Sequence, residues 1–252
     1  MLEYWCGYKS DVVTGRRDVK MKFKHIGIVG CSAPGAALCY QTVCTEAAAL
    51  AGEKYAHPEV SMHTHPFSDY MRFVEAGDWE GVADLMLSSA EKLARIGADF
   101  LITPDNTIHQ SFGLFRGRSP LPWLHIAEEV AAEAGRLNCR RVALLGTKFL
   151  MEGPVYPARF AAAGIEHLIP EEDERKRINR FIFDELVEGR VTPQAREYFL
   201  KVIARLRGEG CDAVGMCCTE IPLLLRPRTD TDLPLLDSTR ILARAAIKRA
   251  AA

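Results

Sequence analysis

The chain has 252 residues, of which 48% are hydrophobic and 26% are charged, and its formal net charge is −1. This composition is typical of a globular protein with a substantial core, and the length suits two ordinary domains or one large α/β unit. The sequence has no basic stripe, no apolar run of about eighteen residues and no basic start followed by an apolar segment, so we expect no nucleic-acid partner, no membrane span and no secretion signal.

The N-terminal stretch and the cysteines bear on location and metal content. Residues 1–22 are polar and mixed in charge, and we interpret them as an extension of undisclosed role. The eight cysteines form no Cys-x-x-Cys pair. This spacing predicts reduced thiols and no metal site, and we expect a cytoplasmic protein.

The first predicted strand runs from His25 to Gly30 and enters a turn of small residues, Cys31 to Ala37, that opens a helix. The turn has neither the Gly-x-Gly-x-x-Gly spacing nor a Gly-Lys-Ser/Thr ending, which argues against a dinucleotide site or a P-loop. Small residues still allow the helix N-terminus to approach a ligand carboxylate. Ser32 is therefore a candidate substrate contact.

Residues 59–66 resemble a second strand that ends in histidines. His63 and His65 would share one face, because side chains alternate along a strand. Such a pair can hold a metal, but no further His or carboxylate stands at a suitable spacing. We favour a ligand-facing or structural pair, with His65 as a candidate substrate contact.

Asp78 is a suitable N-cap for an amphipathic helix that ends at Gly97. A buried strand follows and reaches Thr103, which gives a strand–helix–strand unit and hence a parallel sheet. Asp105 comes directly after this strand and begins a further helix over residues 106–115. Its two possible roles, helix cap and proton-handling group, are compatible.

The second half of the chain again alternates strands and helices. Residues 121–126 and 141–146 are predicted strands, and Thr147 stands at the tip of the latter. Residues 170–189 and 193–208 have the periodicity of charged amphipathic helices. An apolar strand then leads into Cys217, Cys218, Thr219 and Glu220, followed by a last strand and an Ala-rich helix.

Landmarks of the first half recur in the second at a nearly constant spacing. Gly30 is matched by Gly146, Asp105 by Cys218, and residues 121–124 by residues 233–236. Such regular repetition favours duplication. We therefore predict an α/β fold of two similar Rossmann-like parallel-sheet domains related by pseudo-symmetry, with the site in the cleft between them. The first domain would comprise residues 23–117 and 228–252, and the second residues 118–227.

Two motifs then suggest a family. Residues 103–109, Thr-Pro-Asp-Asn-Thr-Ile-His, and residues 217–224, Cys-Cys-Thr-Glu-Ile-Pro-Leu-Leu, resemble the two signatures of the aspartate/glutamate racemase superfamily, and the likeness covers roughly residues 24–250. The resemblance implies a reaction without cofactor, in which one cysteine from each domain acts on opposite faces of the substrate α-carbon. One thiolate removes the α-proton and the other thiol returns a proton.

The chain departs from this pattern at the first motif, where Asp105 stands in place of the usual cysteine. A carboxylate with a pKa near 4 is a weaker base than a thiolate with a pKa near 8.5, so Asp105 needs burial or a neighbouring charge. Single-cysteine members of the superfamily include decarboxylases. Two alternatives to a racemase of aspartate or glutamate follow: a decarboxylase or isomerase of a small dicarboxylate, or a non-catalytic binder.

The resemblance assigns Cys218 and Asp105 to catalysis. Cys217 should point the other way from Cys218, into the core, because side chains alternate along a strand. We expect His109 and Glu220 to support the two catalytic residues, Glu220 by orienting Cys218 and raising its pKa. Lys148 and Lys176 are candidates for binding a distal acidic group of the substrate, although for either one we favour a solvated lysine on a helix face. We predict a homodimer. The candidate substrate-binding residues, for a small carboxylate or amino acid, are Asn106, Thr107, Thr147, Thr219, Ser32, His65 and Lys176.

Overall fold

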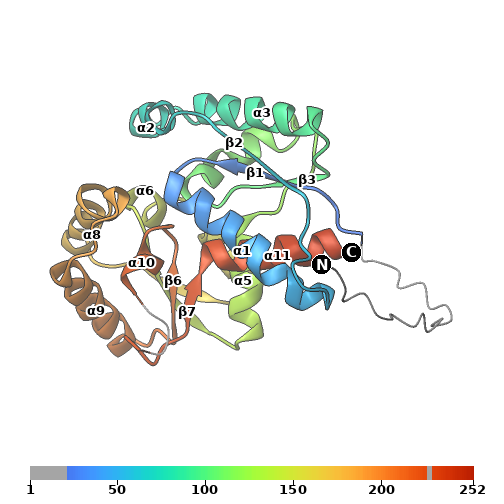
Figure 1. Ribbon diagram of the computed structural model, residues 1–252. Coiled ribbons are helices and arrows are strands. Elements are labelled where there is room, and N and C mark those ends of the chain that lie inside the picture. The colour runs from blue at the N-terminus through green and yellow to red at the C-terminus, as the bar shows by residue number, and fades with distance from the viewer. Residues whose placement is uncertain (1–21, 226–228) are drawn as a thin grey trace, which may run out of the picture.

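The computed structural model describes residues 22–225 and 229–252, which form two parallel β-sheets with helices packed around them (Figure 1). The predicted α/β class, with two similar parallel-sheet units, is confirmed. Residues 1–21 of the predicted extension lie outside the described residues. No helix in the described part of the chain is long and apolar enough to cross a membrane.

The first sheet has the strand order β2-β1-β3, and all its pairings are parallel. β1 is buried along its whole length, as expected for the central strand of a parallel sheet between helices. The predicted N-cap is confirmed, because Asp78 Oδ1 accepts a 2.9 Å hydrogen bond from the Gly81 N–H. The elements of this half are β1 Ile26–Gly30, α1 Ala33–Ala51, β2 Val60–Thr64, α2 Phe67–Ala76, α3 Trp79–Arg95, β3 Phe100–Ile102, η1 Thr107–Ser111 and α4 Phe112–Phe115.

The second sheet has the parallel order β5-β4-β6-β7, so the centre of each sheet repeats the same connectivity. β6 is buried throughout. The elements of this half are α5 Ile126–Arg136, β4 Arg141–Leu145, α6 Lys148–Met151, α7 Pro157–Ala162, β5 Glu166–Leu168, α8 Glu172–Asp184, η2 Leu186–Glu188, α9 Pro193–Gly208, β6 Ala213–Met216, α10 Ile221–Leu224, β7 Leu235–Asp237 and α11 Ser238–Ala251.

The predicted strand over residues 121–126 is reduced to a single parallel bridge between Leu101 and Trp123. Pro122 has no N–H to donate to a ladder, and Ile126 already belongs to α5. In this segment the Pro122 carbonyl accepts a hydrogen bond from the Leu101 N–H, and the Leu124 N–H donates one to the Leu101 carbonyl. It therefore occupies the position beside β3 that β7 occupies beside β6.

The two halves exchange the helices that follow these edge segments. α11 packs on α1 and contributes to the core of the first sheet with Leu242 and Ala246, while α5 packs on α11 and carries Val130 into the second core. Figure 1 shows α11, in red, crossing beside α1. The predicted division placed residues 228–252 in the first domain, which is wrong for β7, because its backbone pairs with β6.

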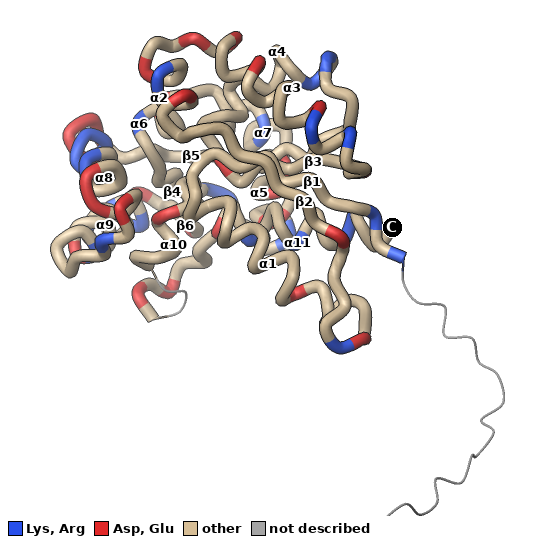
Figure 2. Tube along the Cα trace, turned by 45° about the horizontal axis from the view of Figure 1, so that its top comes forward, with Lys and Arg blue, Asp and Glu red and all other residues tan. Residues whose placement is uncertain are grey.

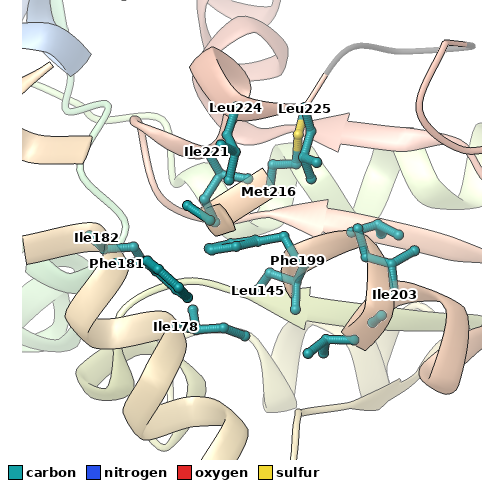
Figure 3. Packing of buried hydrophobic residues seen from close by; sticks show 14 of the residues in the cluster. Leu145, Ile178, Phe181, Ile182, Phe199, Ile203, Met216, Ile221, Leu224 and Leu225 are labelled. Carbon is teal, nitrogen blue, oxygen red and sulfur yellow. The ribbon is translucent and has the colours of Figure 1, made fainter. Parts of the chain in front are cut away.

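The second unit has a further core cluster, besides the one that contains Val130, between its sheet and helices α8 and α9 (Figure 3). Phe199 and Ile178 are fully buried there. The single helix predicted over residues 170–189 is instead divided into α8 and η2, because the backbone leaves the helical region at Glu185 and Gly189 ends the segment with a φ of 75°. The break brings η2 to the edge of the site described next.

Candidate active site

A cavity of about 560 Å³, counted to its open mouth, lies where the carboxyl ends of β1, β3, β4 and β6 meet. Chain segments of both units line it, as predicted for a site in the interdomain cleft. Its polar lining consists of Cys31, Ser32, Asp105, Asn106, Thr107, Thr147, Cys217, Cys218, Thr219 and Glu220.

Asp105 follows β3 and lines this cavity with its carboxyl group. Its Oδ1 accepts a 3.3 Å hydrogen bond from the Ile108 N–H, so it also caps the turn that follows. Burial raises the pKa of Asp105 to about 6, and the charge of Glu220 adds to the increase. The burial that the substitution of Cys by Asp required is therefore present, and the carboxyl group titrates close to neutral pH.

Cys31 is a site residue that sequence reasoning missed. It is 5% exposed, lines the cavity, and hydrogen-bonds to the Asp105 carboxylate. Burial raises the pKa of Cys31, and Asp105 raises it further, so the thiol is the donor in this pair. Its position directly after a buried strand, like that of Cys218 after β6, was the available signal.

Cys218 forms the second thiol–carboxyl pair of the cavity. Its Sγ lies 2.9 Å from Glu220 Oε2 and donates to it. Burial raises the pKa of Cys218 well above its ordinary value, and the charges of Glu220 and Asp105 contribute. Burial and these two charges outweigh any stabilisation of a thiolate by the N-terminus of the short helix α10, which follows. Cys218 is therefore a thiol in the resting site. The predicted effect of Glu220 on Cys218 agrees with this geometry.

Cys217 lies beside Cys218 but belongs to the core, as predicted. It is 2% exposed and packs in the cluster that includes Val142 and Phe160. Burial raises the pKa of Cys217 to about 12, partly offset by a hydrogen bond with Tyr156. Cys217 also lines the cavity, but no acidic or basic residue among the described cavity residues is paired with it.

Hydroxyl groups link the two units across the cavity. Ser32 Oγ lies 3.2 Å from Thr219 Oγ1, and Thr107 Oγ1 lies 3.3 Å from Thr147 Oγ1. A side chain at Gly35 would clash with Thr219, which explains the small-residue turn at the start of α1. These residues are brought together as the sequence predicted.

Asn106 is 2% exposed, and its side chain is largely committed to the protein. Its Oδ1 accepts a 2.6 Å hydrogen bond from the Tyr156 hydroxyl, and its Nδ2 donates to Ser238 Oγ at 3.0 Å. Ser238 in turn donates to the Met216 carbonyl. Asn106 therefore fixes the loop after β3 against both the end of β6 and the start of α11.

His109 supports Asp105 through the backbone. Burial lowers the pKa of His109 to about 4, which keeps the ring neutral. Its Nδ1 lies 2.9 Å from the Asp105 carbonyl and its Nε2 accepts from the Ile126 N–H. The neutral tautomer that fits both contacts donates from Nδ1. His109 thus holds the turn that carries Asp105.

Two predicted substrate contacts do not line the cavity. His65 follows β2, which is the edge strand of its sheet, and packs its ring edge-on against Tyr70 and His63. Lys176 is 60% exposed on α8 and pairs with Glu172 at 2.6 Å. The helix carries charges of both signs (Figure 2), and Lys176 belongs to its exposed surface and not to the cavity lining.

The Asp/Glu/hydantoin racemase family model matches residues 26–246. The chain belongs to this family. The match spans both sheets and both motifs, so the superfamily predicted from residues 103–109 and 217–224 is confirmed.

Individual relatives of the racemase family agree with this result. The structure of a candidate Asp/Glu racemase from Yersinia pestis has a TM-score of 0.82 at 28% identity, covering 90% of this chain and 99% of its own. That of an aspartate racemase homologue from Pyrococcus horikoshii OT3 has a TM-score of 0.77 at 30% identity, covering 91% and 100%. Broad specificity amino-acid racemase RacX of Bacillus subtilis (strain 168) is 22% identical over 170 residues, 68% of this chain and 73% of its own.

Proposed function

We propose that this family member is a cofactor-independent racemase that removes the α-proton of an amino acid on one face and returns a proton on the other. The observation that supports this most strongly is that Asp105 and Cys218, each directly after a buried strand of a different sheet, line one cavity. Two groups are required because a single base most readily returns the proton to the face from which it came.

The two thiol–carboxyl pairs supply the proton transfers. In one direction Cys218 gives its proton to Glu220 and the thiolate takes the α-proton, while neutral Asp105 donates to the opposite face. The electron pair of the broken C–H bond rests on the α-carbon and the substrate carboxylate until that donation. Exchange with solvent resets Glu220 and Asp105, and in the other direction ionised Asp105 abstracts and the Cys218 thiol donates. With a pKa of about 6, Asp105 has both forms available near neutral pH.

The cavity also offers partners for the α-ammonium and α-carboxylate groups. Glu220 Oε1 is buried and has no hydrogen-bond partner among the described residues, so it has an acceptor position free for a substrate N–H. The hydroxyls of Ser32, Thr107, Thr147 and Thr219 line the cavity and can donate to the α-carboxylate. A free acceptor favours an amino acid over the dicarboxylate of the alternative reaction.

The finer predictions stay proposals. Aspartate and glutamate were the substrates predicted from the sequence, and the names of the relatives, an aspartate racemase homologue and a broad-specificity amino-acid racemase, support an amino acid of some kind. Cofactor independence, a homodimer and a cytoplasmic location likewise remain predictions.

Proton exchange in heavy water tests the proposal. The protein is incubated with a panel of single L-amino acids in D₂O, and the α-proton signal and the enantiomer ratio are followed by NMR and chiral chromatography. We expect deuterium at the α-carbon together with appearance of the D-form. A panel in which no amino acid exchanges its α-proton would reject racemisation and leave the binder hypothesis.

A further inference from the structure

The cavity has a continuous apolar wall in addition to its polar lining. Hydrophobic side chains from α2, α6, α8 and η2 form it, among them Phe67, Met71, Val74, Phe149, Phe183 and Val187. Figure 1 shows α2 at the top of the molecule and α8 at its left, and these two helices belong to different units. Several of these side chains are only partly buried, including Phe67, Met71 and Phe183. Partly exposed large hydrophobic groups gathered at a cavity indicate a surface that an apolar ligand group covers.

The charges in the cavity are of one sign. Among the described residues that line it, none is Lys, Arg or His, whereas Asp105 and Glu220 are both acidic. A second carboxylate on a substrate would lose its hydration there without meeting a cation, and it would add a like charge beside Glu220. The cavity therefore disfavours a dianionic amino acid.

Lys148 is the cation nearest in sequence to the polar lining, and it lies on the other side of the wall. It occupies a separate surface depression together with Glu75, and its ammonium group lies 5.2 Å from the centre of the Phe149 ring. Phe149 and Phe183 line both the depression and the cavity, so they stand between Lys148 and the reacting groups.

We propose that the substrate of this site is an amino acid with an apolar side chain, which packs against the wall from α2, α6, α8 and η2. The inference deepens the proposed racemase function, on which it rests, and revises its predicted substrate from aspartate or glutamate. The polar lining holds the two groups on the α-carbon that all amino acids share. Burial of apolar area against the wall then favours an apolar side chain, and an acidic side chain is disfavoured because the described lining residues offer no counter-charge.

The test compares substrates in exchange and in binding. Exchange of the α-proton in D₂O is measured for L-methionine, L-leucine, L-aspartate and L-glutamate, and calorimetry measures binding of the same compounds to Cys218→Ser. We expect kcat/KM for the apolar pair to exceed that for the acidic pair by at least about tenfold. We expect tighter binding of the apolar pair as well.

Two variants separate the wall from the depression. Met71→Arg places a guanidinium at the wall and should shift the preference toward aspartate and glutamate, whereas Met71→Leu should keep the apolar preference. Lys148→Ala should leave the ratio unchanged, because Lys148 does not reach the cavity.

The outcomes distinguish the two proposals. Equal or faster exchange of aspartate or glutamate in the wild type would overturn the apolar inference and leave racemisation standing. A loss of acidic-substrate activity in Lys148→Ala would also overturn it. If no compound exchanges but the apolar pair binds Cys218→Ser more tightly, the racemase function fails and the apolar site stands. If no compound exchanges and the acidic pair binds more tightly, both fail.

Discussion

Replacing Asp105 by Asn should stabilise the protein at neutral pH. The pKa of this carboxyl is raised from 3.8 to about 6, chiefly by burial, with the charge of Glu220 adding to it. The folded state therefore holds the proton to a higher pH than the unfolded state does. Stability contributed by the neutral form is fully present below about pH 4 and is lost as the pH rises through about 6.

The size of this effect follows from the shift. A difference of about two pKa units corresponds to roughly 3 kcal/mol of unfolding free energy. The amide that replaces the carboxyl carries no charge, and its oxygen can still accept from the Ile108 N–H that Asp105 now caps. We expect Asp105→Asn to be more stable than the wild type by up to ~3 kcal/mol at about pH 8, and equally stable near about pH 3.5.

Urea unfolding at the two pH values measures this difference. Asp78→Asn is the matched control, because it makes the same exchange of atoms at the exposed cap of α3. Its effect at each pH is subtracted from that of Asp105→Asn, so that the difference reports the buried position. An Asp105→Asn protein that is no more stable than the wild type at the higher pH would show that the carboxyl is not desolvated, and the acid–base role assigned to it would lose its basis.

Three further predictions concern the thiol–carboxyl pairs. Cys218→Ser should abolish turnover without loss of fold. Iodoacetamide should label Cys218 before Cys217 as activity falls, and mass mapping that finds Cys217 labelled first would contradict the assignment. Glu220→Gln removes a charge that raises the pKa of Cys218, so the pH profile of Cys218 alkylation should move to lower pH, and an unmoved profile would contradict the pairing. The hydrogen bond from Cys31 lowers the pKa of Asp105, so Cys31→Ala should move the acidic limb of the pH–rate profile to higher pH. Cys31→Ser keeps a donor and should leave the limb in place. Equal profiles for the two variants would contradict a role for this hydrogen bond.

The strand tips could be predicted from the sequence because two physical signals coincide there. A buried parallel strand reads as a short apolar run, and the polar residues that follow it, such as Asp105 and Cys218, must emerge at the carboxyl edge of the sheet. The nearly constant spacing of the repeat indicated that the two edges belong to equivalent units. Both inferences depend on the pattern of the sequence alone.

Features that depend on tertiary packing were missed or misplaced. His65 and Lys176 had suitable chemistry, but the edge position of β2 and the orientation of α8 take them out of the cavity. The predicted division of the chain was wrong at β7, whose backbone pairs with β6, because a pattern of apolar residues does not specify which neighbour an element packs against. The apolar wall was not predicted for the same reason, since it is assembled from helices far apart in the chain.

The central claim is that two different groups act on opposite faces of one α-carbon, and the stereochemistry of exchange in single variants tests it most directly. Each enantiomer of an apolar amino acid is incubated in D₂O with Asp105→Asn and with Cys218→Ser, and α-proton loss is followed by NMR. We predict that Asp105→Asn exchanges one enantiomer only, that any exchange left in Cys218→Ser occurs in the opposite enantiomer, and that neither variant interconverts them. Racemisation at the wild-type rate by Asp105→Asn, or exchange of the same enantiomer by both variants, would contradict the two-faced mechanism.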